Sequence, residues 1–277
     1  MSGPLISVPE LRESLGRVAL FDVRWNLEDP SAGRQRYLAG HVPTAVFVDL
    51  DRDLAGVEGP GRHPLPTTAE FAVTLGNLGV SSHTDVVVYD DAGGGVAARM
   101  WWMLRAIGHR GSARVLDGGW QAWADSGFET ATDDTRPAAV AYPTPHRDFR
   151  GVVDREEVVA AAGSHLLFDA RSPERYRGEF EPIDPRAGHI PNAINTPWQA
   201  NLASDGRLLD AGAIRRRFEA LGADRTPVIA SCGSGVNSCH IALAMEIAGL
   251  PRPKLYVGSF SDWARSDLAV AEGPDPE

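Results

Sequence analysis

The two halves of this chain carry the same short motifs in the same order. LFDVR at 20–24 and AGHVPTAVFVDL at 39–50 have counterparts in LFDAR at 167–171 and AGHIPNAINTPW at 187–198. Each half also closes on a tryptophan-containing segment, LDGGWQAW in the first and YVGSFSDW in the second. Ordered repetition at a nearly constant, domain-sized spacing predicts two units of one fold.

Short apolar runs alternate with longer helical patterns inside each half. VVVYD at 86–90 and PVIAS at 227–231 are rich in β-branched residues, whereas AEFAVTLGNLG at 69–79 and AIRRRFEALGA at 213–223 space their apolar residues as a helix does. This alternation predicts an α/β fold in which each domain is a parallel sheet flanked by helices.

Length and composition narrow the function classes. A chain of 277 residues suffices for two ordinary domains, and a polar, proline-rich stretch at 133–151 predicts the linker. We expect domains at 1–140 and 150–277.

A formal net charge of −10 disfavours nucleic acid as a binding partner, and no basic amphipathic or long apolar stretch favours binding to a membrane. Two cysteines, without a secretory pattern at the N-terminus, predict a reducing, cytoplasmic compartment.

The segment around Cys232 is the strongest candidate for chemistry. A strand is expected to end just before Cys232, and a helix to begin near Asn237 or Ser238. Gly233 and Gly235 let successive amides point inward as an anion-binding nest, and the helix dipole adds positive potential. Both effects favour negative charge on sulfur, which makes a nucleophile of a residue that would otherwise be a small buried cysteine.

The first half supplies an internal comparison. When the halves are aligned without gaps on Gly95 and Gly235, Ala92 stands opposite Cys232. The alignment predicts one catalytic domain and one supporting domain that lacks the nucleophile.

These residues identify a resemblance. Cys-Gly-Ser-Gly-Val at 232–236, the GHVP and GHIP segments, the RMWWMLRAIGH helix and the DGGW motif resemble the tandem rhodanese family, closest to its mercaptopyruvate sulfurtransferases. The resemblance implies two rhodanese-like domains, no cofactor, and a persulfide on Cys232. The implied donor is 3-mercaptopyruvate or thiosulfate, and the implied acceptor is cyanide or a thiol such as thioredoxin. Asn237 departs from the threonine usual in the family.

The resemblance also implies substrate-binding residues. Arg175 matches the family arginine that holds the donor's carboxylate, and a guanidinium suits this role because it binds carboxylates bidentately. Arg177 and Arg186 are nearby cations that could serve instead of Arg175, and Arg186 also matches a second family arginine. The remaining substrate contacts are expected from the loop, at Gly233, Gly235, Val236 and Asn237.

A proton relay is a further implication. Ser234 in the loop, with His63 and Asp51 from the first half, matches the positions proposed to move protons in the mercaptopyruvate type. Such a relay suits a donor that must lose a thiol proton and whose enolate must gain one.

Other notable residues favour structural roles. His41 and His189 occupy one slot in both halves although only one half has a nucleophile, and Asp22 and Asp169 are similarly duplicated and are expected to anchor backbone. Cys239 is expected to be buried and inert. The tryptophans are expected in the core: Trp101, Trp102, Trp120 and Trp123.

Several rival functions are disfavoured. A cysteine phosphatase requires arginine six positions after the nucleophile, where this chain has Ser238. The glycines at 90–99 do not complete a dinucleotide fingerprint, and no close Cys or His pairs predict a metal site. A persulfide carrier or regulatory module that turns over poorly stays open. Because Gly233 and Ser234 carry no charge, mercaptopyruvate is favoured over thiosulfate as donor.

Overall fold

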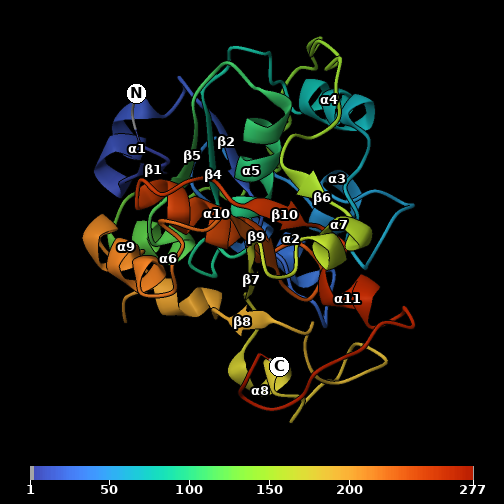
Figure 1. Cartoon of the computed structure of the whole chain (residues 1–277). Coiled ribbons are helices and arrows are strands. Elements are labelled where there is room, and N and C mark those ends of the chain that lie inside the picture. The colour runs from blue at the N-terminus through green and yellow to red at the C-terminus, as the bar shows by residue number, and fades with distance from the viewer. Residues whose placement is uncertain (1–2, 277) are drawn as a thin grey trace. The chain divides into compact units, whose positions relative to one another are not determined.

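The computed structural model describes residues 3–276, which form two compact units (Figure 1). The first unit contains the chain up to Gly56, Pro66–Arg150 and Ser204–Leu208. The second contains Val57–Leu65, Gly151–Ala203 and the chain from Leu209 onward. The expected domains, 1–140 and 150–277, follow chain order and therefore differ from these units at two short segments. Val57–Leu65 belongs to the second unit and Ser204–Leu208 to the first.

Each unit is built on a five-stranded parallel sheet. The first sheet has the order β1-β5-β4-β2-β3 and the second the order β6-β10-β9-β7-β8, which is the same order at corresponding positions. The strands of the first sheet are β1 Leu5–Ile6, β2 Ala19–Asp22, β3 Val46–Phe47, β4 Val86–Tyr89 and β5 Ala113–Leu116. Those of the second are β6 Val152–Val153, β7 Leu166–Asp169, β8 Ala193–Asn195, β9 Val228–Ser231 and β10 Lys254–Tyr256. The predicted duplication and parallel α/β class are confirmed.

Helices connect the strands and cover the sheets. In the first unit they are α1 Val8–Ser14, α2 Ala32–Ala39, α3 Leu50–Asp53, α4 Thr68–Asn77, α5 Ala97–Ile107 and α6 Gly119–Asp125. In the second they are α7 Arg155–Ala160, α8 Pro173–Tyr176, the 3₁₀ turn η1 Trp198–Asn201, α9 Ala211–Glu219, α10 Ser238–Ile247 and α11 Ser259–Trp263. Capping boxes at Ser7, Thr67 and Asp154 satisfy orphan amides and set where α1, α4 and α7 begin. No helix among residues 3–276 has the length and apolar character needed to cross a membrane.

The duplicated residues sit in the two cores. His41 stacks on the ring of Tyr37 and His189 on that of Tyr176, with centroids 3.9 and 3.8 Å apart. Each histidine Nδ1 also lies 2.8 Å from the carbonyl oxygen of its tyrosine partner. The expected structural role of these histidines agrees with these contacts. Trp101, Trp102 and Trp123 are almost fully buried, and Trp120 is partly buried against the first core.

The duplicated aspartates hold an arginine as well as backbone. Asp22 accepts hydrogen bonds from the amide and guanidinium of Arg24, and Asp169 does the same for Arg171. The ion pairs measure 2.6 and 2.7 Å, and all four side chains are buried. Pairing compensates the cost of burying each charge. The same buried ion pair is therefore present in both units.

Candidate active site

Cys232 begins the loop between β9 and α10. Its Sγ accepts a hydrogen bond from the Gly235 amide at 3.1 Å and lies 3.9 Å from Ser259 Oγ. The Cys232 amide donates to the same Ser259 oxygen at 3.1 Å. Only 2% of the residue is exposed. The strand-to-helix loop predicted from the sequence is therefore present, with an amide donor directed at the sulfur.

Gly235 is required by the backbone of this loop. Its φ is +78°, in the left-handed region, and a Cβ placed on it would lie 2.3 Å from the Val257 carbonyl oxygen. The following Val236 is buried, while Asn237 precedes α10 in helical conformation without a side-chain capping bond. The loop conformation that directs the Gly235 amide at the sulfur therefore requires glycine at this position.

Cys239 lies on α10 and is fully buried. Its Sγ donates to the Gly235 carbonyl oxygen at 3.5 Å. This position agrees with the expectation of a structural cysteine.

The residue that replaces Cys232 in the first unit is Asp90, not Ala92. Asp22 pairs with Tyr89 in the first sheet, and Asp169 pairs with Ser231 in the second, so the residues that follow these strands correspond. The prediction of Ala92 was wrong by two residues. Gly94 rather than Gly95 corresponds to Gly235, since each lies three residues before its helix and has a positive φ. In addition, the first loop has seven residues between strand and helix, 90–96, and the second has six, 232–237. An ungapped alignment on the loop glycines does not detect that extra residue.

The Asp90 carboxylate fills the nest of the first unit. Its two oxygens accept hydrogen bonds of 2.8–2.9 Å from four backbone amides, those of Ala92, Gly94, Val96 and Ala97. The first unit therefore keeps an anion-binding loop and supplies the anion itself.

His63 and Ser234 are brought together within the second unit. His63 Nδ1 lies 2.8 Å from Ser234 Oγ, and both side chains are buried. The segment Val57–Leu65, which carries His63, belongs to the second unit although it comes early in the chain. Asp51 belongs to the first unit, where its carboxylate accepts a hydrogen bond of 2.8 Å from Trp25 Nε1. Its part in a relay stays a prediction.

Contacts at Gly61 and Arg62 hold this segment against α11 and the residue before it, Gly258. Gly61 has φ +80°, and a Cβ on it would lie 2.5 Å from the Gly258 carbonyl oxygen. The Arg62 amide donates to Ser261 Oγ at 3.0 Å. Because His63 is the next residue, these contacts fix its position beside Ser234.

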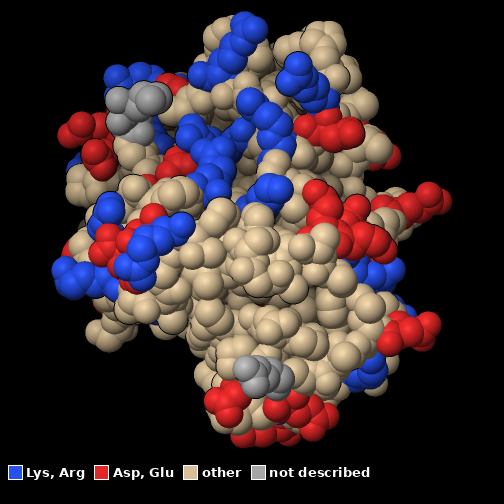
Figure 2. Space-filling model, viewed as in Figure 1, with Lys and Arg blue, Asp and Glu red and all other residues tan. Residues whose placement is uncertain are grey.

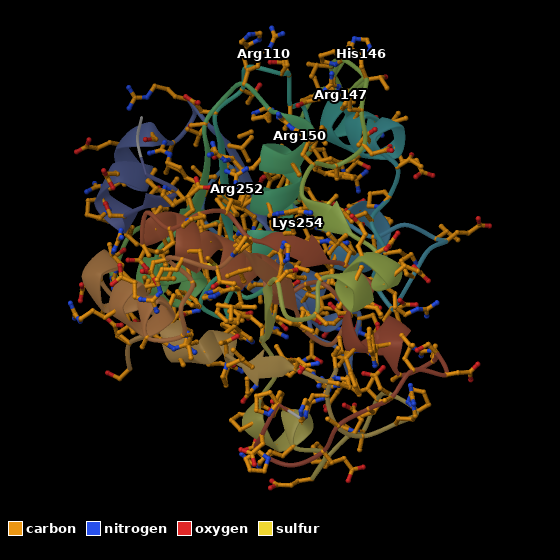
Figure 3. All side chains as sticks on the ribbon, in the orientation of Figure 1. Arg110, His146, Arg147, Arg150, Arg252 and Lys254 are labelled. Carbon is orange, nitrogen blue, oxygen red and sulfur yellow. The ribbon has the colours of Figure 1, made fainter. Side chains whose placement is uncertain are left out.

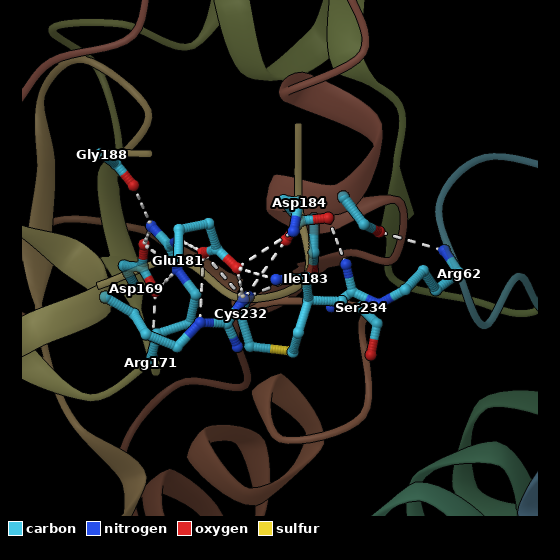
Figure 4. Close-up of polar contacts among 12 residues, drawn as sticks. Arg62, Asp169, Arg171, Glu181, Ile183, Asp184, Gly188, Cys232 and Ser234 are labelled. Atoms are coloured by element: carbon cyan, nitrogen blue, oxygen red, sulfur yellow. Dashed lines mark hydrogen bonds and ion pairs between the residues drawn. The ribbon is translucent and has the colours of Figure 1, made fainter. Parts of the chain in front are cut away.

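Arg62 and Arg175 contact a pair of buried carboxylates near the loop, Glu181 and Asp184. Figure 4 labels Arg62 and both carboxylates. Arg175 Nε and Nη2 donate to Glu181 at 2.7–3.2 Å, and Nη2 also lies 3.3 Å from Asp184. Arg62 Nη1 forms an ion pair with Asp184. The carboxylate groups of Glu181 and Asp184 are almost completely buried, so they orient both guanidinium groups.

The two carboxylates differ in their electrostatics. Burial raises the pKa of Glu181, but hydrogen bonds from Arg175 and from backbone amides outweigh burial, and the net pKa lies below its usual value. At Asp184 burial prevails over the charge of Arg62, and the pKa is raised. Burial likewise lowers the pKa of Arg62, against the charge of Asp184.

Arg62 does not stand out in the sequence, yet it is part of this cluster. A methyl group built on Gly233 would lie 3.0 Å from Arg62 Nη2 and 3.3 Å from Arg175 Nη1. The one sequence feature that could have pointed to Arg62 is its position next to His63 in a glycine-rich segment. Sequence alone does not connect that segment with Gly233, which is far away in the chain.

Arg186 and Arg177 are engaged elsewhere. The Arg186 guanidinium donates to four carbonyl oxygens, those of Trp263, Ala264, Ser266 and Leu268, at 2.8–3.0 Å. Arg177 pairs with the exposed Glu179. The Arg186 hydrogen bonds hold the chain that leaves α11. A role for Arg186 or Arg175 in binding the donor's carboxylate stays a prediction.

A separate cavity of about 540 Å³ lies in the first unit and does not include Cys232. Its lining includes Arg110, His146, Arg147 and Arg150, labelled in Figure 3, and Figure 2 shows Lys and Arg side chains gathered over this part of the surface. The lining contains no cysteine, so the cavity offers cations but lacks the nucleophile that sulfur transfer requires.

Comparison with known proteins identifies the family of this chain. A family model described as "Rhodanese-like domain" matches residues 7–126 and 154–266. A probable 3-mercaptopyruvate sulfurtransferase of Pseudomonas aeruginosa is 41% identical over 281 residues, covering 95% of each chain. A putative thiosulfate sulfurtransferase of Mycobacterium tuberculosis is 40% identical, covering 89% of this chain and 88% of that protein.

Solved structures show the same likeness. The 3-mercaptopyruvate sulfurtransferase from Leishmania major aligns with a TM-score of 0.84 at 29% identity, over 95% of this chain and 74% of that chain. The corresponding enzyme from Escherichia coli aligns with a TM-score of 0.80 at 29% identity, over 93% of this chain and 99% of that chain.

Proposed function

This chain belongs to the rhodanese-like domain family, and from that premise we propose that it is a sulfurtransferase in which Cys232 carries sulfur as a persulfide. The observation that carries the proposal is the position of Cys232 Sγ, at the start of a strand-to-helix loop with the Gly235 amide 3.1 Å away. An amide directed at sulfur favours the anionic forms, both thiolate and persulfide.

We propose 3-mercaptopyruvate as the preferred donor. The Cys232 thiolate attacks the donor sulfur, a sulfur–sulfur bond forms, and the carbon–sulfur bond breaks with its electron pair on carbon. The donor's thiol proton leaves sulfur, and the pyruvate enolate takes up a proton. The products are the Cys232 persulfide anion and pyruvate, so atoms and charge balance.

His63 and Ser234 are suited to move that proton. Their 2.8 Å contact provides a path between two groups that each gain and lose protons readily. Asp51 is proposed, from the family resemblance, as the third member of the relay. Arg175 is proposed to bind the donor's carboxylate through Nη1, because Glu181 holds its Nε and Nη2.

The second half of the cycle regenerates the thiolate. A thiolate or cyanide attacks the outer sulfur of the persulfide, the sulfur–sulfur bond breaks, and its electron pair returns to Cys232. A thiol protein such as thioredoxin is the proposed protein acceptor. We place the reaction in the cytoplasm, because both cysteines are free thiols, as a reducing compartment keeps them.

The alternative donor is thiosulfate. The presence of Arg62 beside Gly233 favours this alternative, because the loop then has cations nearby even though its own residues are uncharged. A persulfide carrier that turns over poorly with both small donors is the non-catalytic alternative.

The test compares Cys232→Ser with Cys239→Ser in steady-state turnover of mercaptopyruvate and thiosulfate. We expect Cys232→Ser to abolish turnover with both donors and Cys239→Ser to retain most of it, because only Cys232 begins the loop. Persistence of substantial turnover in Cys232→Ser would overturn the mechanism. Stoichiometric sulfur loading without turnover in the wild type would instead favour the carrier.

A further inference from the structure

Two guanidinium groups converge on the residue that follows the nucleophile. Measured from a methyl group built on Gly233, Arg62 Nη2 lies at 3.0 Å and Arg175 Nη1 at 3.3 Å. Gly233 itself has no side chain, so these cations occupy the space that a side chain of the loop would otherwise fill. The positive charge next to Cys232 therefore comes from other segments of the second unit.

The carboxylates orient these cations without using all their donors. Asp184 holds Arg62 Nη1, and Glu181 holds Arg175 Nε and Nη2. Within residues 3–276, the buried Nε of Arg62 has no hydrogen-bond partner. Arg62 Nη2 and Arg175 Nη1 are the donors nearest Gly233, so an anion bound there would receive hydrogen bonds from two separate guanidinium groups.

We infer that Arg62 determines donor specificity, binding the sulfonate end of thiosulfate together with Arg175, while its neighbour His63 serves mercaptopyruvate. The inference rests on the proposed sulfur transfer through Cys232. Two adjacent residues of one segment would thus each serve a different donor. Arg62, which lies beside Gly233, would serve thiosulfate, and His63, which contacts Ser234, would serve mercaptopyruvate.

The chemistry of the two donors explains this division. With thiosulfate, the Cys232 thiolate attacks the outer sulfur, and the sulfur–sulfur bond of the donor breaks with its electron pair on sulfite. Sulfite leaves as a dianion and needs no proton, so its departure depends on cations. Mercaptopyruvate has a single carboxylate and requires the proton transfer described above, so its reaction depends on His63 and Ser234.

The decisive measurement is kcat/KM with each donor for Arg62→Gln and His63→Asn in the full chain. Loss of one charge-assisted contact in a buried site is expected to lower kcat/KM by roughly tenfold to a hundredfold. We expect Arg62→Gln to lower kcat/KM for thiosulfate by that factor and for mercaptopyruvate by a clearly smaller one. His63→Asn should show the opposite order, and Arg62→Lys should retain more thiosulfate activity than Arg62→Gln.

Arg265→Gln is the matched control. Arg265 Nη1 also lies near Asp184, at 3.8 Å, but Arg265 is half exposed and does not appear among the atoms nearest Gly233. Its replacement should change neither donor's kcat/KM by more than about twofold, because a 3.8 Å contact from a half-exposed guanidinium is weak.

Turnover of the less affected donor shows that each variant is folded: mercaptopyruvate for Arg62→Gln and thiosulfate for His63→Asn. Equal losses for both donors in Arg62→Gln, or an unchanged thiosulfate reaction, would overturn the inference. So would a wild type that uses mercaptopyruvate but not thiosulfate. If the wild type transfers sulfur from neither donor, the proposed function itself fails, which is a different result.

Discussion

At the scale of single residues, Asp90 and Cys232 show how one backbone arrangement serves two purposes. Both follow the central strand of their sheet, and both accept backbone hydrogen bonds from the loop that follows. Asp90 is a permanent anion that satisfies four amides. Cys232 places a sulfur atom, which is a weaker hydrogen-bond acceptor, at the corresponding position. The first unit therefore has a fixed carboxylate where the second has a cysteine sulfur.

Replacing Asp90 tests this view. We expect Asp90→Ala to lower the free energy of unfolding by about 2–4 kcal/mol, because several buried amides lose their acceptor together. Asp90→Asn, which keeps one carbonyl oxygen, should cost less. The measurement is equilibrium unfolding in denaturant, with each transition fitted separately.

Asp91→Asn is the control for Asp90. Asp91 forms a more exposed ion pair with Arg36, so its replacement should cost under about 1 kcal/mol. Equal costs at the two positions would contradict the assigned role of the Asp90 carboxylate.

At the scale of elements, the strand–loop–helix unit of β9 and α10 depends on backbone conformation. The loop turns at Gly235, where a positive φ and the nearby Val257 carbonyl leave no space for a side chain. The same turn aims the Gly235 amide at Cys232 Sγ. The geometry of the nucleophile is therefore coupled to the packing of the loop against the residues after β10.

Gly235→Ala should disturb both packing and chemistry. The left-handed conformation costs a non-glycine residue about 1–2 kcal/mol, and the 2.3 Å approach to Val257 adds a clash that the backbone must relieve. We expect sulfur transfer to fall by at least about tenfold and the free energy of unfolding to fall by about 3 kcal/mol. Turnover and denaturant unfolding are the measurements.

Gly222→Ala separates the two contributions. Gly222 has φ +87°, but the nearest atoms to its Cβ position lie 3.9 Å away, so only the backbone cost applies. We expect a loss of about 1 kcal/mol with turnover retained. A Gly235→Ala enzyme as active as Gly222→Ala would show that the loop tolerates the change.

At the scale of the whole molecule, the chain does not complete one unit before it starts the other. Val57–Leu65 comes from the first half and belongs to the second unit, whereas Ser204–Leu208 does the reverse. The first of these segments brings Arg62 and His63 to the loop of Cys232. The unit that contains Cys232 therefore includes residues from the other half of the sequence.

Gly61→Ala is expected to displace this segment. A Cβ there would lie 2.5 Å from the Gly258 carbonyl oxygen and 2.7 Å from Ser261 Oγ. Because Ser234 would lose its histidine partner, we expect mercaptopyruvate turnover to fall by about tenfold or more while Cys232 remains present. Steady-state kinetics is the measurement.

Gly16→Ala is the matched control for Gly61. Gly16 has φ +76° and nothing within 4 Å of its Cβ position, so it carries the backbone cost alone. Retained turnover in Gly16→Ala with loss in Gly61→Ala is the expected pattern. Equal turnover in both variants would show that the segment does not depend on the Gly61 contact.

The sequence by itself determined the duplicated parallel α/β fold, the loop of Cys232 and the helix that follows it. These features rest on local patterns: apolar periodicity, glycine positions and repeated motifs, all of which act over a few residues. The candidates Ser234, His63 and Arg175 came from family resemblance. The structure places His63 against Ser234 and Arg175 near Gly233.

Only the tertiary structure decided which distant groups meet. It placed Arg62 beside Gly233 and showed that Arg186 donates to backbone carbonyls. It also showed that Asp90, and not Ala92, is the residue of the first unit equivalent to Cys232. The physical reason is that these contacts depend on the path of loops and on strand pairing between segments far apart in the chain. A loop that is longer by one residue shifts the alignment of the halves, and strand pairing is what reveals the shift.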